Sequence, residues 1–92
     1  MTIVWSRRAI RHLGQVRDYI AQDSPDSAAD IAARIVEAVE RLALYPNLGR
    51  PGHIIGTREL VVPDTPYRIP YRIRGSRVEL IAVFHGRQRW KP

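Results

Sequence analysis

The chain has 92 residues, contains no cysteine and carries a formal net charge of +6. This length suits one small domain, residues 1–92, with a limited hydrophobic core. The lack of cysteine excludes disulfides, thiolate metal sites and thiol nucleophiles. No stretch approaches the roughly 20 apolar residues of a membrane span, and the first residues lack the apolar segment of a secretion signal. We therefore expect a protein of the reducing cytoplasm that does not enter a membrane.

The positive charge is concentrated in the second half of the chain. Residues 1–45 contain six arginines and six acidic residues, whereas residues 46–92 contain eight arginines and Lys91 against three acidic residues. A basic half of this kind attracts polyanions or an acidic protein segment. Arginine also binds phosphate and carboxylate in a bidentate way that lysine cannot. A genome rich in arginine codons would give the same composition, so the positions of the arginines carry more information than their number.

The first half predicts a short strand and two amphipathic helices. TIVW at 2–5 is apolar, β-branched and aromatic, as in a buried or edge strand. Ser6 suits a helix N-cap, and an apolar stripe follows at helical spacing: Ala9, Leu13, Val16 and Ile20. Ser24 and Pro25 suit the start of a second helix, which should end before Pro46. The stripe of this second helix is formed by Ile31, Ile35, Val39 and Leu42. The short connection predicts an antiparallel helical hairpin.

The second half predicts a loop and three strands. Residues 45–56 are rich in proline and glycine, and three apolar side chains should anchor this loop: Leu48, Ile54 and Ile55. The expected strands cover 57–62, 66–74 and 77–85. The resulting order is β-α-α-β-β-β, an α+β fold with the helical hairpin packed on one face of a small, mainly antiparallel sheet. The order of the strands within the sheet stays open.

Gly75 and Ser76 predict a two-residue turn between the last two strands. Such a turn gives one face that carries only apolar pairs: Tyr67 with Phe84, Ile69 with Ala82, Tyr71 with Leu80, and Ile73 with Val78. A shift by one residue would place Ile73 opposite Glu79, so the pattern favours this register. Pro70 has no N–H for the ladder bond expected at its position, which predicts a bulge or a local gap.

The opposite face of this hairpin carries arginines: Arg68, Arg72, Arg74 and Arg77, with His85 near its end. We expect the tyrosine face to pack on the helices and the arginine face to look outward, partly open to solvent. Arg72 falls opposite Glu79, which predicts a cross-strand ion pair. Arg74 and Arg77 flank the turn and are expected to be solvated.

Three motifs in 57–90 carry a family resemblance: R-x-L-V-V-P, Y-x-I-x-Y-R-I and V-x-L-I-A-V-F-H-G-R. With the order of elements, they resemble the RelE/ParE superfamily, the toxins of bacterial type II toxin–antitoxin modules, over essentially the whole chain. The resemblance implies a cognate antitoxin that wraps and neutralises the toxin in a hetero-oligomeric complex. Antitoxins of this kind usually bind operator DNA, so the toxin would meet operator DNA only through its antitoxin. No cofactor is implied.

The resemblance leaves two branches open, because RelE-like members cut mRNA in the ribosomal A site whereas ParE-like members poison DNA gyrase without being nucleases. A metal-independent nuclease needs a base, an acid and cations around the phosphorane. The candidates for these roles are His85, Arg58, Glu59, Arg68 and Arg87. For Glu59 the alternative is a salt bridge to a sheet arginine, and for His85 a hydrogen bond to a loop carbonyl.

Two departures from the RelE-like pattern favour the ParE-like branch. Gly86 follows His85 where RelE-like nucleases with this histidine typically have a tyrosine, and Lys91 is the only lysine where many RelE-like members carry lysine clusters against ribosomal RNA. A gyrase inhibitor would have no active site and would contact gyrase, or its antitoxin, through the arginine face and the C-terminal tail. The candidate binding residues are Arg68, Arg72, His85, Arg87, Arg89 and Trp90. Tryptophan and arginine dominate interface hot spots, although Trp90 has the alternative of folding back to cap the core.

Two further kinds of site are disfavoured. His12 and His53 have no second ligand at a useful spacing, so no metal site is expected. A plain nucleic-acid-binding module follows from the basic half alone. It is disfavoured because the hairpin tyrosines are expected on the core side, not interleaved with exposed arginines.

Overall fold

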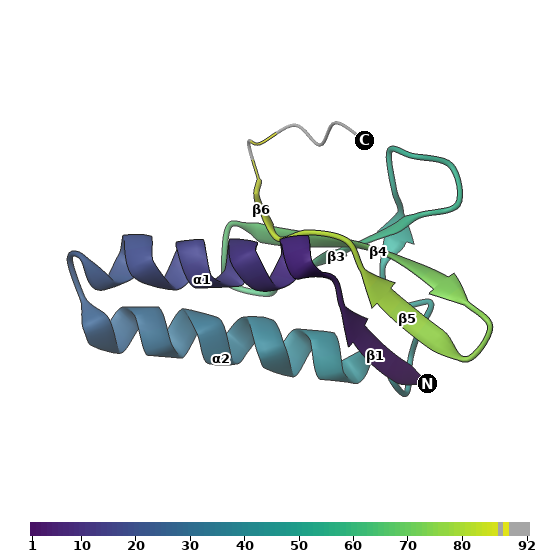
Figure 1. The fold of residues 1–92 in the computed structure, drawn as a ribbon, viewed down its shortest axis with the longest axis horizontal. Coiled ribbons are helices and arrows are strands. Elements are labelled where there is room, and N and C mark those ends of the chain that lie inside the picture. The colour runs from purple at the N-terminus through teal and green to yellow at the C-terminus, as the bar shows by residue number, and fades with distance from the viewer. Residues whose placement is uncertain (87, 89–92) are drawn as a thin grey trace.

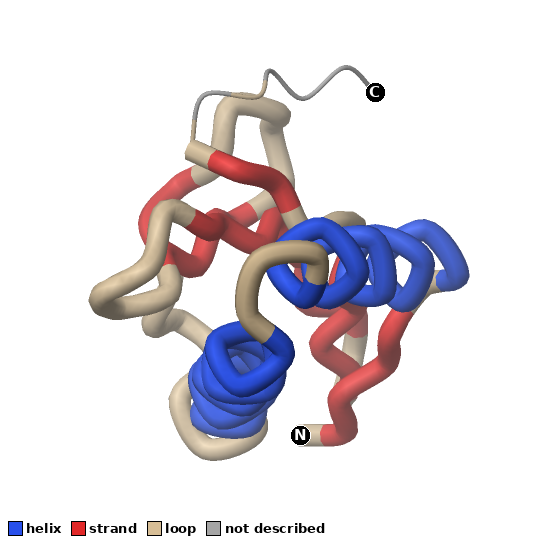
Figure 2. The backbone as a smooth tube through the Cα atoms, turned by 90° about the vertical axis from the view of Figure 1, so that its left-hand side faces the viewer, coloured by secondary structure: helices blue, strands red, loops and turns tan. Residues whose placement is uncertain are grey.

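The structure, a computed structural model, describes residues 1–86 and 88. Two helices form an antiparallel hairpin beside a mixed, mostly antiparallel sheet (Figures 1 and 2). The turn between the helices reaches beyond the edge of the sheet (Figure 1). The predicted α+β class and the predicted packing of a helical hairpin on a small sheet are confirmed.

Both helices begin directly after the serines that the sequence indicated as N-caps, Ser6 and Ser24. α1 covers Arg7–Ala21 and α2 covers Pro25–Arg41. The hydroxyl of Ser6 accepts a hydrogen bond from the N–H of Ala9 at 3.0 Å, and the hydroxyl of Ser24 accepts one from Ser27 at 3.2 Å. Each cap satisfies an N–H group that the first helical turn leaves without a partner.

The sheet has the order β1-β5-β4-β3-β2. Its strands are β1 (Thr2–Trp5), β2 (Arg50–Pro51), β3 (Arg58–Val61), β4 (Tyr67–Arg74), β5 (Arg77–Leu80) and β6 (Phe84–His85). β1 is an edge strand and runs parallel to β5, while the other pairs are antiparallel. The segment predicted as one strand over 77–85 is two strands, β5 and β6, and the two-residue β2 was not predicted.

The predicted hairpin register holds only as far as Pro70. Tyr71 lies opposite Leu80 and Ile73 opposite Val78, as expected. Beyond that point the chain leaves the ladder at 81–83, and β6 returns one residue out of step. His85 lies opposite Tyr67, and Phe84 opposite Arg68. The predicted pairs of Tyr67 with Phe84 and of Ile69 with Ala82 are therefore wrong, and the predicted irregularity at Pro70 is confirmed.

Pro70 and Ser6 together explain this irregularity. The carbonyl of Pro70 accepts a hydrogen bond from the N–H of Ile81 at 2.9 Å, but proline has no N–H to return to the carbonyl of Ile81. The hydroxyl of Ser6 donates to that carbonyl at 3.0 Å. Ser6 thus caps α1 and also fills the hydrogen-bonding gap that Pro70 leaves in the sheet.

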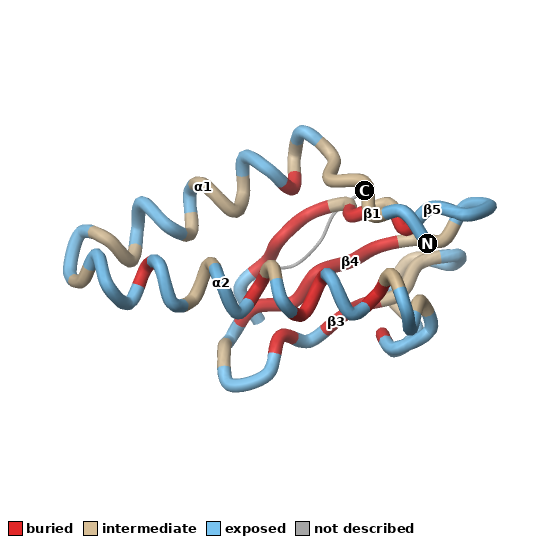
Figure 3. The backbone as a smooth tube through the Cα atoms, turned by 90° about the horizontal axis from the view of Figure 1, so that it is seen from below, coloured by how far each residue is buried: buried red, intermediate tan, exposed pale blue. Residues whose placement is uncertain are grey.

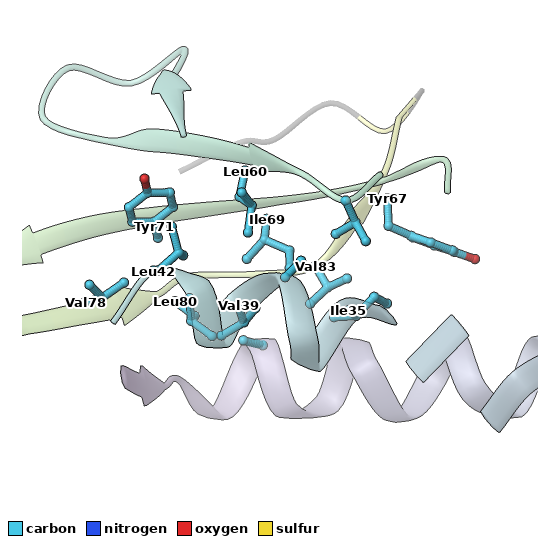
Figure 4. Close-up of a cluster of buried hydrophobic side chains, with 13 residues drawn as sticks. Ile35, Val39, Leu42, Leu60, Tyr67, Ile69, Tyr71, Val78, Leu80 and Val83 are labelled. Atoms are coloured by element: carbon cyan, nitrogen blue, oxygen red, sulfur yellow. The ribbon is translucent and has the colours of Figure 1, made fainter. Parts of the chain in front are cut away.

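The hydrophobic core lies between the helices and the tyrosine face of the sheet (Figures 3 and 4). Its largest fully buried side chains are Tyr71, Ile35, Leu42, Ile69 and Leu80. The predicted tyrosine face therefore does pack on the helices. The Tyr71 hydroxyl donates to the carbonyl of Pro46 at 2.7 Å and accepts from the N–H of Gly49 at 2.8 Å, which fastens the chain after α2. The expected loop anchors Leu48 and Ile55 are exposed, so that expectation is wrong for both.

Candidate functional site

The outer face of the sheet, which points away from the helices, carries the charged side chains. Alternation along β4 places Arg68, Arg72 and Arg74 there, because neighbouring residues of a strand point to opposite faces. Glu59 of β3 and Glu79 of β5 lie on the same face by register. These residues form two separate clusters, each centred on one carboxylate.

The first cluster is centred on Glu59, whose side chain is only 3% exposed. Its two oxygens accept from Arg50 at 3.0 Å and from Arg68 at 3.2 Å. Arg68 is itself buried, lies over the ring of Phe84 at 5.3 Å from the ring centroid, and donates to the carbonyl of Gln88. The alternative that Glu59 is the salt-bridge partner of a sheet arginine is confirmed. The expectation of an open arginine face is wrong at this end of the sheet.

The second cluster is centred on Glu79 and is much more exposed. Arg72, Arg74 and Arg77 approach this one carboxylate at 3.6, 3.4 and 3.5 Å. The predicted pair of Arg72 with Glu79 is confirmed, and Arg74 and Arg77 contact Glu79 as well as solvent. Three guanidinium groups around one carboxylate leave a surplus of positive charge on this part of the outer face.

Phe84 lies inside a cationic pocket that the sequence did not indicate. The Arg8 guanidinium lies 5.4 Å from the centroid of its ring, and the ring of His12 lies 5.5 Å away. The Nδ1 atom of His12 accepts a hydrogen bond from the N–H of Val83 at 3.2 Å, which joins α1 to the segment between β5 and β6. Burial and the positive charges of Arg8 and Arg11 lower the pKa of His12, so the neutral form that accepts this bond is favoured.

His85 and Arg58 are not on the face that carries Glu59 and Arg68. The ring of His85 meets Tyr67 edge-on at 5.7 Å between ring centroids, because the register shift moves it to the tyrosine side. Arg58 lies opposite Tyr71, also on the helix side, and donates to the carbonyl of Gly49 at 2.8 Å. The expectation that His85 shares the arginine face is therefore wrong. The four candidate nuclease residues that the structure describes are therefore divided between the two faces of the sheet.

Three of the predicted binding residues, Arg87, Arg89 and Trp90, lie outside the described residues. In residues 1–86 and 88, no three histidine or acidic side chains gather as metal ligands would. No helix in this described part of the chain is long and apolar enough to cross a membrane.

Comparison with known proteins gives the family. Residues 3–90 match the family described as the ParE toxin of type II toxin–antitoxin systems, parDE. The chain belongs to this family, and so to the RelE/ParE superfamily of type II toxins.

The similar proteins carry names from both branches. The chain is 52% identical over 88 residues to the putative toxin Y4kP of Sinorhizobium fredii, and the matched region covers 96% of this chain and 91% of that one. It is 39% identical over 84 residues to toxin RelE2 of Caulobacter vibrioides, spanning 91% and 93% of the two chains. A chain of the chromosomal ParDE toxin–antitoxin system from P. aeruginosa has a TM-score of 0.83 at 27% identity, over 92% of this chain and 95% of that one.

Proposed function

We propose that this type II toxin inhibits DNA gyrase by direct protein contact and has no active site of its own. The observation that carries the proposal is the separation of the four candidate nuclease residues that the structure describes. Glu59 and Arg68 are buried against each other on the outer face, whereas Arg58 and His85 lie on the other side of the sheet. A base, an acid and the cations that stabilise a phosphorane must converge within about 3 Å of the reacting atoms. The surplus of arginine around Glu79 suits a docking surface better.

The experiment that tests this proposal is induction of the toxin in cells, scored together for DNA breaks with an SOS response and for codon-position cuts in mRNA. We expect DNA breaks while the message stays intact. Cut message without DNA breaks, abolished by His85→Ala, would show that the chain is a nuclease and that the proposal is wrong.

The alternative function is ribosome-dependent cleavage of mRNA, as in RelE-like toxins, and one observation favours it. The relative from Caulobacter vibrioides with 39% identity is named toxin RelE2. In this alternative, His85, Arg58, Glu59, Arg68 and Arg87 would have to converge on bound mRNA, and the two faces of the sheet would have to rearrange to allow it.

We also propose a cognate antitoxin as the partner that neutralises the toxin in the cytoplasm and binds the operator. The similar P. aeruginosa structure is itself a ParDE toxin–antitoxin system. A suitable surface is a groove of about 300 Å³ between α2 and β3, whose lining includes Ala38, Val61, Arg41 and Arg50. Leu48 and Val61 are about half exposed there, at 51% and 49%. An antitoxin segment with apolar and acidic side chains would cover them.

A further inference from the structure

A second groove lies on the outer face, between the loop that joins β2 to β3 and the start of α1. It has a volume of about 510 Å³, and its walls combine isoleucine and arginine side chains: Ile54, Ile55, Ile81, Arg8, Arg72 and Arg74. The loop stands clear of the sheet at the upper right of Figure 1. The groove is separate from the α2–β3 groove assigned above to the antitoxin, because no residue lines both.

The loop that forms one wall is held in place by its own hydrogen bonds. The N–H of Gly52 donates to the carbonyl of Thr57 at 2.9 Å, and both the N–H and the hydroxyl of Thr57 donate to the carbonyl of Ile54, at 3.1 and 2.6 Å. Gly56 completes the turn with a φ of +85°, a conformation that favours glycine. Ile55 at the tip is fully exposed. A single exposed isoleucine is common on protein surfaces, but Ile55 lies with Ile54 and Ile81 along one groove, and apolar side chains gathered in a groove are typical of binding sites.

The arginines in the groove have more positive charge than the neighbouring carboxylates neutralise. Arg72 and Arg74 share Glu79 with Arg77. Within residues 1–86 and 88, no carboxylate lies within ion-pair distance of Arg8, whose guanidinium lies over Phe84. The Nε atom of Arg72 is buried 3.6 Å from Oε1 of Glu79 and has no hydrogen-bond partner, so Glu79 satisfies this guanidinium only in part. An added carboxylate would find guanidinium donors here, and such charge-assisted hydrogen bonds are among the stronger polar contacts in proteins.

We propose that this groove docks an acidic segment of the target protein that carries an apolar anchor beside its carboxylates. The anchor would cover Ile54 and Ile55, and the carboxylates would bind Arg8, Arg72 and Arg74. The inference rests on the proposed function, since it places the contact with gyrase on this part of the outer face. A nucleic acid fits the groove less well. No aromatic ring lines the groove for base stacking, and contact between an isoleucine side chain and a charged phosphate adds little binding energy.

The test measures the affinity of the full-length toxin for purified gyrase holoenzyme of the host bacterium. The groove variants are Ile55→Asp and Arg74→Glu. The matched controls make the same chemical changes at exposed positions away from the groove, Leu44→Asp and Arg17→Glu. Leu44 is 77% exposed, and the side chain of Arg74 is 59% exposed, so each variant should fold, which circular dichroism checks. We expect each groove variant to bind gyrase about tenfold more weakly and each control within about twofold of the wild type.

Three other outcomes would overturn the inference, and they separate it from the proposed function. If the wild type binds gyrase and both groove variants bind equally well, the groove is not the contact, although the gyrase proposal stands. If the variants lose affinity for the antitoxin and keep gyrase binding, the groove belongs to the antitoxin. If the wild type does not bind gyrase but the groove variants lose binding to RNA, both proposals are wrong.

Discussion

Ser6 illustrates how one side chain can serve two elements. Its hydroxyl accepts a hydrogen bond from the N–H of Ala9 in α1. The same hydroxyl donates to the carbonyl of Ile81, which receives no ladder bond from Pro70 because proline has no N–H. The capping role follows from sequence, because serine before an apolar stripe is a local pattern. The bond to Ile81 spans 75 residues of sequence, so no local pattern could indicate it.

The variant Ser6→Ala should lower the free energy of unfolding by about 2 kcal/mol, because it removes a helix cap and leaves a partly buried carbonyl without a partner. Ser24→Ala is the matched control, since it removes the cap of α2 and otherwise only an exposed hydrogen bond to the Ser27 hydroxyl, and should lower this free energy by about 1 kcal/mol. Urea denaturation measures both. Equal losses for the two variants would contradict the second role of Ser6.

The buried ion pair of Glu59 with Arg68 allows a second prediction at the scale of single residues, with a larger expected loss of stability. Glu59→Gln should lower the free energy of unfolding by about 3 kcal/mol, because it leaves the buried guanidinium of Arg68 without its carboxylate. Adding Arg68→Met should recover part of this loss, which a double-mutant cycle would measure. The control is Asp30→Asn, which breaks an exposed ion pair with Arg34 and should change the free energy by less than about 0.5 kcal/mol. A stable Glu59→Gln variant would argue that the pair has a functional role rather than a structural one.

At the scale of elements, the short irregular segment after β5 has the largest effect on which side chains lie on each face of the sheet. The chain leaves the ladder after Leu80 and returns at Phe84 one residue out of register. Since neighbouring residues of a strand point to opposite faces, this single step exchanges the sides of Phe84 and His85. Phe84 then fills the space between Arg8 and Arg68, and His85 moves away from the arginines.

The hairpin turn and α1 provide a pair of glycine substitutions with opposite expected signs. Gly75 has a φ of +57°, so Gly75→Ala should lower the free energy of unfolding by about 1 kcal/mol. Gly14 lies within α1, and a Cβ added there meets no atom within 4 Å. Gly14→Ala should therefore raise the free energy of unfolding by up to about 1 kcal/mol, since alanine favours the helix. Thermal unfolding of the two variants gives the signs, and a stabilising Gly75→Ala would contradict the turn geometry.

At the scale of the whole molecule, the fold separates apolar and charged surfaces. The helices cover the tyrosine face of the sheet, and the outer face keeps two carboxylates among five arginines: Arg50, Arg68, Arg72, Arg74 and Arg77. Five arginines against two carboxylates give this outer face a formal charge of +3, half of the net charge of +6 of the whole chain. Binding of an acidic partner to this surface should weaken as salt rises.

The proposed antitoxin surface makes a prediction at this scale. Val61→Asp and Arg41→Glu, which change the α2–β3 groove, should each weaken antitoxin binding about tenfold in calorimetric titrations. Arg17→Glu should leave this affinity within about twofold. Separate charge reversals at Arg72 and Arg87 test whether the antitoxin also covers the arginine face. Arg68 is unsuitable for this test, because reversing a buried charge would unfold the protein.

Local sequence patterns were enough to predict the elements that depend on neighbours a few residues apart. The two helices with their serine caps, the turn at Gly75, the register up to Pro70 and the place of the irregularity all follow from local spacing and from the missing N–H of proline. The family motifs also lie in continuous segments. These features need no knowledge of distant parts of the chain.

Which side chains meet across the molecule could be learned from the folded arrangement but not from local patterns. The parallel pairing of β1 with β5, the burial of Arg68 against Glu59 and the pocket around Phe84 each depend on contacts between different elements of the fold. The physical reason is that periodicity fixes the face of a strand only while its register is unbroken. After Pro70 interrupts the ladder, the path of 81–83 and its bond to His12 on α1 decide on which face His85 lies.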